Sequence, residues 1–133
     1  MKSGIEFFAV RGLSKFLRAF GLRKAAWDIE HAQFFWETTK KSPLMIEKIS
    51  SMLDGGTLIE FGCGDGTLPQ YLPSGSFSKY VGYDISSVAV KTCKNRNSDP
   101  KVSYDAQDMA TWRGLEGSKA DLIVCEECLN YLD

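Results

Sequence analysis

Residues 58–66, which read LIEFGCGDG, place a carboxylate directly before a bend that is rich in glycine. Glu60 lies in an apolar run, and Gly62, Gly64 and Gly66 follow it at intervals of two. Glycine accepts positive φ angles and lets a ligand approach the backbone closely, so we expect the N–H groups of this bend to face a ligand. Tight turns between a strand and a helix also use glycine, and the spacing differs from the GxGxxG of dinucleotide-binding proteins. The bend alone therefore does not identify a ligand.

Two further carboxylates follow later apolar runs. Asp84 ends the stretch YVGYD, and Asp108 lies beside Met109 in AQDMA. Asp84 can accept hydrogen bonds from both hydroxyls of a ribose, and each bond to an ionised acceptor contributes roughly 1.5–3 kcal/mol. Asp108 can accept from an exocyclic amine while Met109 covers an aromatic ring. The simpler interpretations stay open, with Asp84 as a helix N-cap or first-turn acid and Asp108 as an aspartate of a turn.

The elements that would bring these acids together alternate along the chain. Short apolar or β-favouring runs predict strands at 57–61, 80–83, 102–104 and 122–125. Helical or turn-rich stretches separate them at 67–72, 87–95 and 111–115. This order predicts an α/β fold with a Rossmann-like parallel sheet of about four strands and helices on its faces. Because ligands bind at the carboxyl ends of such strands, we expect Glu60, Asp84 and Asp108 to meet at one edge.

Helices are predicted ahead of the first strand, which divides the chain into a helical extension at 1–41 and a sheet domain at 42–133. The first helix, at 5–20, carries one apolar side, made of Phe8, Leu13, Phe16, Leu17 and Phe20. Its basic residues point another way: Arg11, Lys15 and Arg18. This pattern suits either a helix on an anionic membrane surface or a lid or packing helix with a solvated basic face.

Two more helices are predicted on either side of that boundary. The one at 27–39 contains His31, the only histidine, which is either a base near a substrate or a surface or packing residue. Ser42 and Pro43 suit the start of the next helix, as an N-cap oxygen and a proline in the first turn. Its expected apolar face consists of Leu44, Met45, Ile49, Met52 and Leu53. Gly55 and Gly56 are expected to end it in a left-handed C-cap.

Four ordered motifs between residues 44 and 133 together resemble the class I S-adenosylmethionine-dependent methyltransferases: EFGCGDG, YVGYDIS, YDAQDM and DLIVCEECLNYL. The resemblance implies S-adenosylmethionine as the cofactor, whose ammonium, ribose diol and aminopurine match the three acids. It also implies that the protein's main task is to hold donor and acceptor in line, without a particular general base. The catalytic residues are therefore left unassigned.

The resemblance implies a role for each residue of these motifs. The methionine part of the donor would be held by Glu60, Gly62, Cys63, Gly64 and Gly66, and the ribose by Asp84. The adenine would be held by Ile85, Asp108 and Met109, and the pocket wall would include Cys125. Glu127 matches the acid of the family's SEVLEHL-like segment.

Length and composition narrow the class of protein further. The 133 residues suit one domain, 44% of them are hydrophobic, and the net charge is −1. No basic groove or aromatic platform appears in the core, so we expect a small-molecule methyl acceptor and no nucleic-acid partner. No apolar run approaches the roughly 20 residues that cross a bilayer, and Glu6 and Arg11 interrupt any signal peptide, so a cytoplasmic location is expected.

The four cysteines are then expected to be reduced thiols: Cys63, Cys93, Cys125 and Cys128. The last two form a CxxC pair, which invites a metal or redox interpretation. One such pair, without a second pair of cysteines or histidines, is half a zinc site. We therefore predict no metal.

The family's sheet has seven strands, of which this sequence supplies the first four. A strand at 122–125 without its next neighbour exposes backbone groups, which favours self-association or a partner chain. Three hypotheses follow. The chain is the donor-binding half of a methyltransferase for a small molecule, or a noncatalytic S-adenosylmethionine-binding or partner-completed interaction module. A nucleotide-binding dehydrogenase fragment is disfavoured by the glycine spacing and by Asp108.

Overall fold

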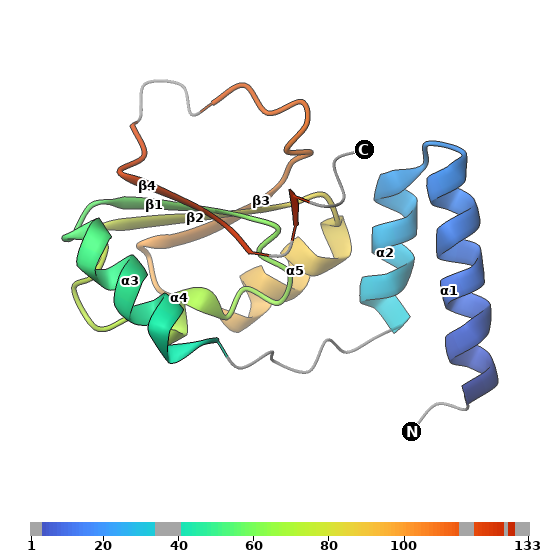
Figure 1. Ribbon diagram of the computed structural model, residues 1–133, viewed down its shortest axis with the longest axis horizontal. Coiled ribbons are helices and arrows are strands. Elements are labelled where there is room, and N and C mark those ends of the chain that lie inside the picture. Colours follow the sequence, from blue (N-terminus) through green and yellow to red (C-terminus); the bar gives the residue numbers. More distant parts are fainter. Residues whose placement is uncertain (1–3, 34–40, 115–118, 127, 130–133) are drawn as a thin grey trace.

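In the computed structural model of the protein, residues 4–33, 41–114, 119–126, 128 and 129 are described, with the backbone alone for residues 4–8. Two helices come first, α1 (Gly4–Ala19) and α2 (Arg23–Gln33), and they form a hairpin beside the rest of the molecule (Figure 1). The later elements are α3 (Pro43–Leu53), β1 (Thr57–Phe61), α4 (Leu68–Tyr71), β2 (Lys79–Asp84), α5 (Ser87–Arg96), β3 (Val102–Ala106) and β4 (Leu122–Cys125).

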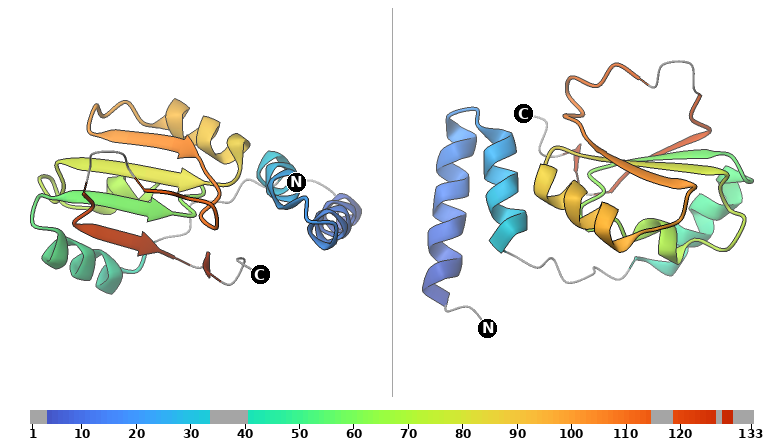
Figure 2. Two further views of the ribbon diagram at one scale, coloured as in Figure 1. Left: turned by 90° about the horizontal axis from the view of Figure 1, so that it is seen from above. Right: turned by 180° about the vertical axis from the view of Figure 1, so that it is seen from behind.

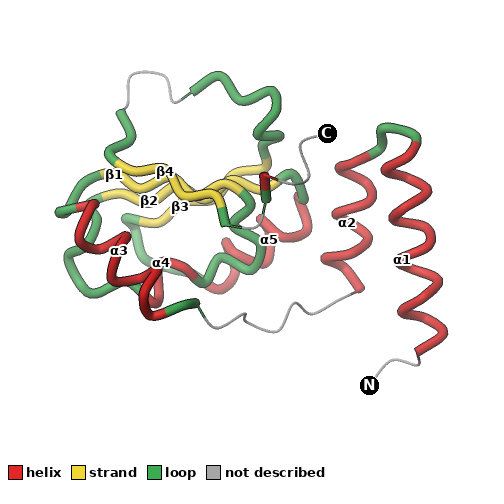
Figure 3. The backbone as a smooth tube through the Cα atoms, in the orientation of Figure 1, coloured by secondary structure: helices red, strands yellow, loops and turns green. Residues whose placement is uncertain are grey.

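The strands of the described chain form one parallel sheet in the order β3-β2-β1-β4 (Figure 3). β1 and β4 have the predicted bounds, whereas β2 and β3 extend beyond them. Phe61 at the end of β1 lies opposite both Tyr83 and Cys125, so the central strands end at the same level. The predicted α/β fold, with a Rossmann-like parallel sheet of about four strands behind N-terminal helices, is confirmed.

The sheet separates two hydrophobic layers. Helices α3, α4 and α5 cover one face, where Leu58 and Tyr80 are fully buried (Figure 1). The chain after β3 crosses the other face, where the Trp112 ring lies 5.0 Å from Phe61 and 6.0 Å from Tyr83 between centroids. Among the described elements, helices therefore cover one face and a loop covers the other. The sequence predicted helices on both faces without distinguishing them.

The stretch predicted at 111–115 as helical or turn-rich forms a turn in its described part. The Thr111 N–H and hydroxyl both donate to the Asp108 carbonyl, at 3.0 and 3.2 Å. Gly114 then takes a φ of 97°, which does not continue a right-handed helix. Leu115 lies outside the described residues.

Helix α3 begins and ends close to the residues predicted from the sequence, but the contacts at its ends differ from those predicted. Ser42 is the N-cap and Pro43 lies in the first turn, but the Ser42 side chain makes no capping hydrogen bond. The left-handed end is formed by Asp54, with a φ of 42°, and by Gly55, with a φ of 76°. The predicted pair of Gly55 and Gly56 is therefore shifted by one residue.

The predicted apolar faces are only partly buried. In α3, Ile49 and Leu53 belong to the core, but Leu44 and Met52 are exposed. In α1 the fully buried side chain is Ser14, while much of the predicted apolar side faces solvent. The side of α1 that meets α2 is therefore not its apolar side, because a polar pairing described below decides this contact.

The helical hairpin lies beyond the carboxyl ends of the strands (Figure 2). Asp28 of α2 holds it against the start of α5: its Oδ1 accepts from the Ser86 hydroxyl at 2.8 Å and from the Val88 N–H at 3.3 Å. Burial opposes ionisation of Asp28, but hydrogen bonds from Lys24 and Ser86 outweigh it and lower its pKa. Residues 34–39 of the helix predicted at 27–39 lie outside the described residues, and the domain boundary after residue 41 stays a prediction.

Candidate functional site

A cavity of about 260 Å³ lies where the carboxyl ends of β1, β2 and β3 face the helical hairpin. Most of the residues predicted to bind the donor line it: Gly62, Cys63, Gly64, Asp84, Ile85, Asp108 and Met109. The structure therefore brings the second and third predicted acids and the first half of the glycine bend to one place. Pockets for small ligands form at this position of open α/β sheets.

Three predicted residues do not line the cavity: Glu60, Gly66 and Cys125. Gly66 is buried, and its carbonyl accepts from the Tyr104 hydroxyl at 2.8 Å. Cys125 packs beside Phe61 and Tyr83 in the loop-covered layer. Their donor-binding roles stay predictions, and Glu127 lies outside the described residues.

The backbone N–H groups of the glycine bend are mostly used within the protein. Gly62 and Cys63 both donate to the Tyr83 carbonyl, at 2.8 and 3.1 Å, and Gly66 donates to the Cys63 carbonyl at 2.8 Å. The Gly64 N–H donates to Asp84. The bend was expected to direct these groups at a ligand; instead the N–H groups of Gly62, Cys63 and Gly64 connect the bend to the end of β2, and that of Gly66 closes the bend on itself.

Asp84 has the geometry of a carboxylate that is fixed by backbone. Its Oδ2 accepts from the Gly64 N–H at 3.0 Å, and its Oδ1 accepts from the Ser86 N–H at 2.9 Å. Ser86, not Asp84, is the N-cap of α5, since its hydroxyl accepts from the Ala89 N–H at 3.2 Å. A carboxylate offers about four acceptor positions, so Asp84 keeps capacity for further donors in the cavity.

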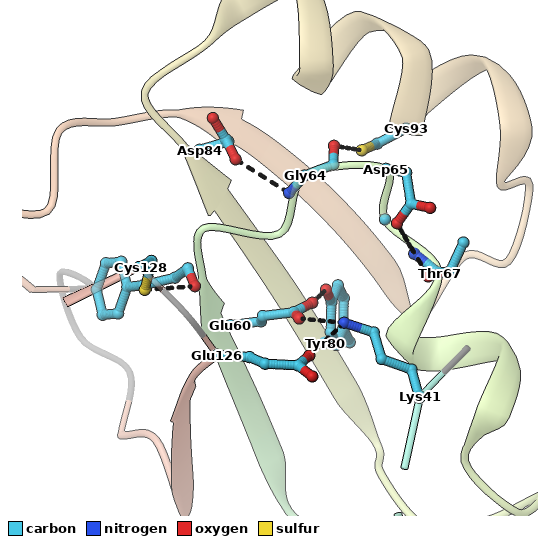
Figure 4. A network of polar contacts seen from close by, with 12 residues as sticks. Lys41, Glu60, Gly64, Asp65, Thr67, Tyr80, Asp84, Cys93, Glu126 and Cys128 are labelled. Atoms are coloured by element: carbon cyan, nitrogen blue, oxygen red, sulfur yellow. Dashed lines mark hydrogen bonds and ion pairs between the residues drawn. The ribbon is translucent and has the colours of Figure 1, made fainter. Parts of the chain in front are cut away.

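Glu60 lies beneath the cavity, in a buried cluster with Tyr80 and Lys41 (Figure 4). The Tyr80 hydroxyl donates to its Oε2, and the Lys41 ammonium lies 3.8 Å from its Oε1. Burial raises the pKa of Glu60 to about 7, although the hydrogen bond from Tyr80 and the charge of Lys41 act to lower it. Glu60 is therefore close to half protonated near neutral pH.

Lys41 connects this cluster to the cavity. Its ammonium donates to Glu126 as well, and both Lys41 and Glu126 line the cavity (Figure 4). Burial disfavours the charged ammonium, but Glu126 and Glu60 outweigh that cost and raise the pKa of Lys41 above its ordinary value. One end of the cavity therefore carries a cation between acids.

Asp108 is already paired with a cation of the hairpin. Its Oδ2 accepts from the Arg23 guanidinium at 2.9 Å, and its Oδ1 accepts from the Ala110 N–H at 2.9 Å. Asp108 is thus an aspartate of a turn and also a residue of the cavity wall, so the two interpretations of the sequence apply together. The adenine role predicted for it has to share this carboxylate with Arg23.

Several lining residues were not predicted to bind the donor: Arg23, Trp27, Lys41, Phe61, Asp65, Tyr83, Gln107, Glu126 and Cys128. Asp65 lies inside the glycine motif, so its position was a usable signal. Its Oδ1 accepts from the Thr67 hydroxyl at 2.9 Å, whereas its buried Oδ2 has no hydrogen-bond partner among the described residues. An unsatisfied buried carboxylate oxygen in a cavity wall suits a ligand that brings a donor.

His31 also lines the cavity, on the side formed by α2. Burial lowers its pKa, although the carboxylates of Asp84 and Glu30 act to raise it. The imidazole is therefore neutral near pH 7. This position is compatible with the interpretation of His31 as a base and does not by itself assign that role.

The thiol pair Cys125 and Cys128 lies beside the glycine bend. All four cysteines of the chain are described, and none forms a disulfide. The Cys128 thiol donates to the Phe61 carbonyl at 3.3 Å, and a Cβ on Gly62 would lie 2.6 Å from the Cys128 Cβ. Burial raises the pKa of Cys128 to about 11, so this thiol is protonated at neutral pH. Within the described part of the chain, no group of three or more His, Cys, Asp or Glu side chains is arranged to hold a metal ion.

Solved structures share this fold. An S-adenosylmethionine-dependent methyltransferase from Thiobacillus denitrificans, in complex with S-adenosylhomocysteine, matches 71% of this chain and 40% of its own, at 16% identity and a TM-score of 0.52. An amino pentose methyltransferase from Micromonospora echinaspora matches 95% and 43%, at 20% identity and a TM-score of 0.51. A magnesium protoporphyrin IX methyltransferase from Synechocystis matches 93% and 57%, at 19% identity and a TM-score of 0.50.

The chain thus spans less than two thirds of the length of these structures. A search of curated proteins found no match. The family described as "Methyltransferase domain" matches residues 29–133, which is most of the sequence. The chain therefore belongs to the methyltransferase-domain family, and the resemblance of its motifs to the class I S-adenosylmethionine-dependent methyltransferases is confirmed.

Proposed function

We propose that this chain binds S-adenosylmethionine in the cavity at the strand ends and is the donor-binding half of a methyltransferase for a small molecule. The observation that carries the proposal is the meeting of Asp84, Asp108 and the glycine bend in one cavity wall, within a domain of this family. A cytoplasmic location accompanies the proposal as a prediction.

The adenosine part is assigned to the β2 and β3 side. Asp84 is buried and held by two backbone N–H groups, so its remaining acceptor positions are fixed in space for the ribose hydroxyls. Ile85 and Met109 offer apolar surface for the adenine, and Asp108 offers an acceptor for the exocyclic amine. Fixing donor and acceptor groups before binding reduces the entropy cost of holding the ligand.

The amino-acid part is assigned to the end of the cavity that contains Lys41. The methionine end of the donor carries an ammonium and a carboxylate, and this end of the cavity offers charges of both signs. Asp65, whose Oδ2 has no hydrogen-bond partner within the described chain, and Glu126 suit the ammonium, while Lys41 suits the carboxylate. In this arrangement Glu60 acts from below, by holding Lys41 in place.

S-adenosylmethionine supplies a methyl group that is activated by its sulfonium and needs no metal. The residues of this chain have to bind and orient it and to keep water away from the transfer line. Trp27 and His31 of α2 close the cavity opposite the strand ends, where an acceptor would approach. We expect a small molecule as the acceptor, because the net charge of the whole chain is −1 and gives no general attraction for a nucleic acid.

Calorimetric titration of the 133-residue chain with S-adenosylmethionine and with S-adenosylhomocysteine tests the proposal. We expect micromolar dissociation constants for both ligands and no measurable heat for an Asp84→Ala variant. A Glu47→Ala variant is a matched control, because Glu47 is exposed on α3 and outside the cavity. Absence of heat for the unmodified chain with either ligand would contradict the proposal, and unchanged affinity of Asp84→Ala would remove Asp84 from the ribose role.

A noncatalytic or partner-completed module is a second candidate, favoured by the edge of the sheet. β4 pairs with β1 on one side and is the last strand of the described sheet, with Ile123 exposed. An exposed edge strand is a surface for strand addition by a second copy or a partner chain. Light scattering would test this candidate. A dimer that becomes monomeric on Ile123→Lys substitution would support it, whereas a monomer at all concentrations would contradict self-association.

A further inference from the structure

The outer helix of the hairpin meets its neighbour through polar groups. Ser14 is fully buried, and its hydroxyl donates to the Glu30 carboxylate of α2. The Arg18 guanidinium pairs with Glu30 at 3.0 Å and lies 4.4 Å above the centroid of the Trp27 ring. A hydroxyl, a guanidinium and a carboxylate therefore fix which side of α1 faces α2.

This pairing leaves exposed apolar side chains on the outer side of α1 and in the turn that follows it, which we call the outer stripe: Leu13, Phe16, Phe20 and Leu22. Their side chains are exposed by 47%, 58%, 67% and 54%. The first three recur at helical spacing, and the Phe16 and Phe20 rings lie 4.6 Å apart between centroids. Single exposed apolar residues are ordinary, but a contiguous row of four marks an interaction surface.

Charge indicates what covers this surface. From Phe7 to Trp27 the sequence contains five basic residues and no acid: Arg11, Lys15, Arg18, Arg23 and Lys24. Arg18, Arg23 and Lys24 form ion pairs with acids of α2 and of the sheet domain. Lys15 is exposed on α1. A second copy of the chain would bring like charges together at the stripe, whereas an anionic surface would complement them.

We propose that the outer stripe docks on the surface of an anionic phospholipid bilayer, with the aromatic side chains at the boundary between headgroups and acyl chains and with Lys15 near the phosphates. Helices that combine an exposed apolar side with an excess of basic residues over acids bind in this way, and α1 has Arg11, Lys15 and Arg18 against Glu6. Among the described residues no helix is long and apolar enough to cross a membrane, so the contact is with the surface. The proposal does not depend on binding of a methyl donor.

Vesicle flotation of the 133-residue chain tests it. We expect the protein to float with phosphatidylcholine vesicles that contain phosphatidylglycerol and to remain at the bottom of the gradient with vesicles of pure phosphatidylcholine. Raising the salt concentration is expected to release it from the anionic vesicles. A Phe16→Ser/Phe20→Ser double variant is expected to lose at least about tenfold in vesicle affinity, because it removes the apolar anchor. A Lys15→Glu variant is expected to weaken binding to the anionic vesicles.

A matched control comes from α3, where Leu44 is more exposed than any residue of the stripe but lies outside it. Leu44→Ser is expected to bind vesicles like the unmodified chain, and circular dichroism is expected to be the same for all variants. No flotation with anionic vesicles, equal flotation with neutral vesicles, or full flotation of the double variant would each overturn the proposal. A concentration-dependent dimer that the double variant abolishes would assign the stripe to a second copy instead.

Discussion

The cavity has two walls that are built by different means. The wall from the sheet consists of strand ends and the glycine bend, and backbone hydrogen bonds fix it: Tyr83 accepts from two N–H groups of the bend, and Asp84 accepts from Gly64 and Ser86. The wall from the N-terminal segment consists of Arg23, Trp27, His31 and Lys41. It is attached by side chains, through the contacts of Asp28, Arg23 and Lys41.

This difference indicates that the two walls of the cavity have different roles. Backbone hydrogen bonds within a sheet hold positions with little freedom, so the sheet wall can present fixed acceptors to a donor. Side-chain ion pairs that are partly exposed contribute roughly 0–1 kcal/mol each, so the helical wall can open at modest cost. We therefore expect substitutions in the sheet wall to affect folding, and substitutions in the helical wall to affect docking and access.

The largest effect is expected at Gly66. A Cβ at this position would lie 2.7 Å from the Cys93 Sγ and 3.0 Å from Tyr104, and φ is +70°. Gly66→Ala should lower the free energy of unfolding by about 2–5 kcal/mol, measured by urea denaturation. Gly64→Ala is the matched comparison: its φ is +52° but its Cβ meets only the Gly62 carbonyl at 3.9 Å, so about 1–2 kcal/mol is expected. Equal losses would show that packing against α5 and β3 does not fix the bend.

The next effect is a dependence of the free energy of unfolding on pH, which is caused by Glu60. Because burial raises its folded pKa to about 7, from 4.5, the folded protein holds a proton that the unfolded chain has lost between these values. The contribution of Glu60 to stability is complete below pH 4.5 and falls as pH rises through 7, by about 3 kcal/mol in total. Glu60→Gln should remove this slope.

The measurement is urea denaturation of both proteins from pH 4 to pH 8. The Gln variant keeps an acceptor for Tyr80 and the volume of the side chain, so the two stability curves should differ mainly in slope. Parallel curves over this pH range would mean that Glu60 titrates normally and would remove it from the buried cluster.

A smaller effect on global stability, with a clear local signature, is expected in the helical wall. Asp28→Ala removes the acceptor for Ser86, Ser87 and Val88, which should cost about 1–2 kcal/mol of docking free energy. Hydrogen exchange should then accelerate in α2 and at the start of α5 while β1 and β2 stay protected. Acceleration throughout the sheet would show that the two walls unfold as one unit.

The smallest effect is expected from Arg23→Met. The ion pair with Asp108 is partly exposed, so its loss should change stability by less than about 1 kcal/mol. If Asp108 accepts from the adenine amine, removal of the competing guanidinium should tighten binding of S-adenosylhomocysteine by about threefold in calorimetry. Weaker binding would show instead that Arg23 contacts the ligand.

The sheet wall could largely be predicted from the sequence, because its determinants are local. Strand runs, the glycine bend and the acids at strand ends are read along the chain, and parallel strands bring their ends together. Two details of this wall were not predictable in this way. The N–H groups of Gly62 and Cys63 turn to Tyr83, and Gly66 supports Tyr104, because contacts between strands decide both.

Apart from His31, the helical wall was missed, because its residues lie in separate segments that only tertiary packing brings to the cavity. Nothing around Arg23 or Lys41 in the sequence indicates their partners Asp108 and Glu126, which lie 85 positions away in each case. The side of α1 that meets α2 could not be predicted, for a related reason. Periodicity counts apolar residues, whereas the buried pair of Ser14 and Glu30 decides the orientation of the helix.

The match to the family begins at residue 29, yet Arg23, Trp27 and Asp28 come before it. A chain shortened to the family boundary would keep the glycine bend and lose the indole, the guanidinium and the anchor that close the cavity from above. We therefore expect the N-terminal helices to act as a cover of the cavity. Replacing them with the corresponding segment of another methyltransferase would change what reaches the cavity while leaving its floor intact.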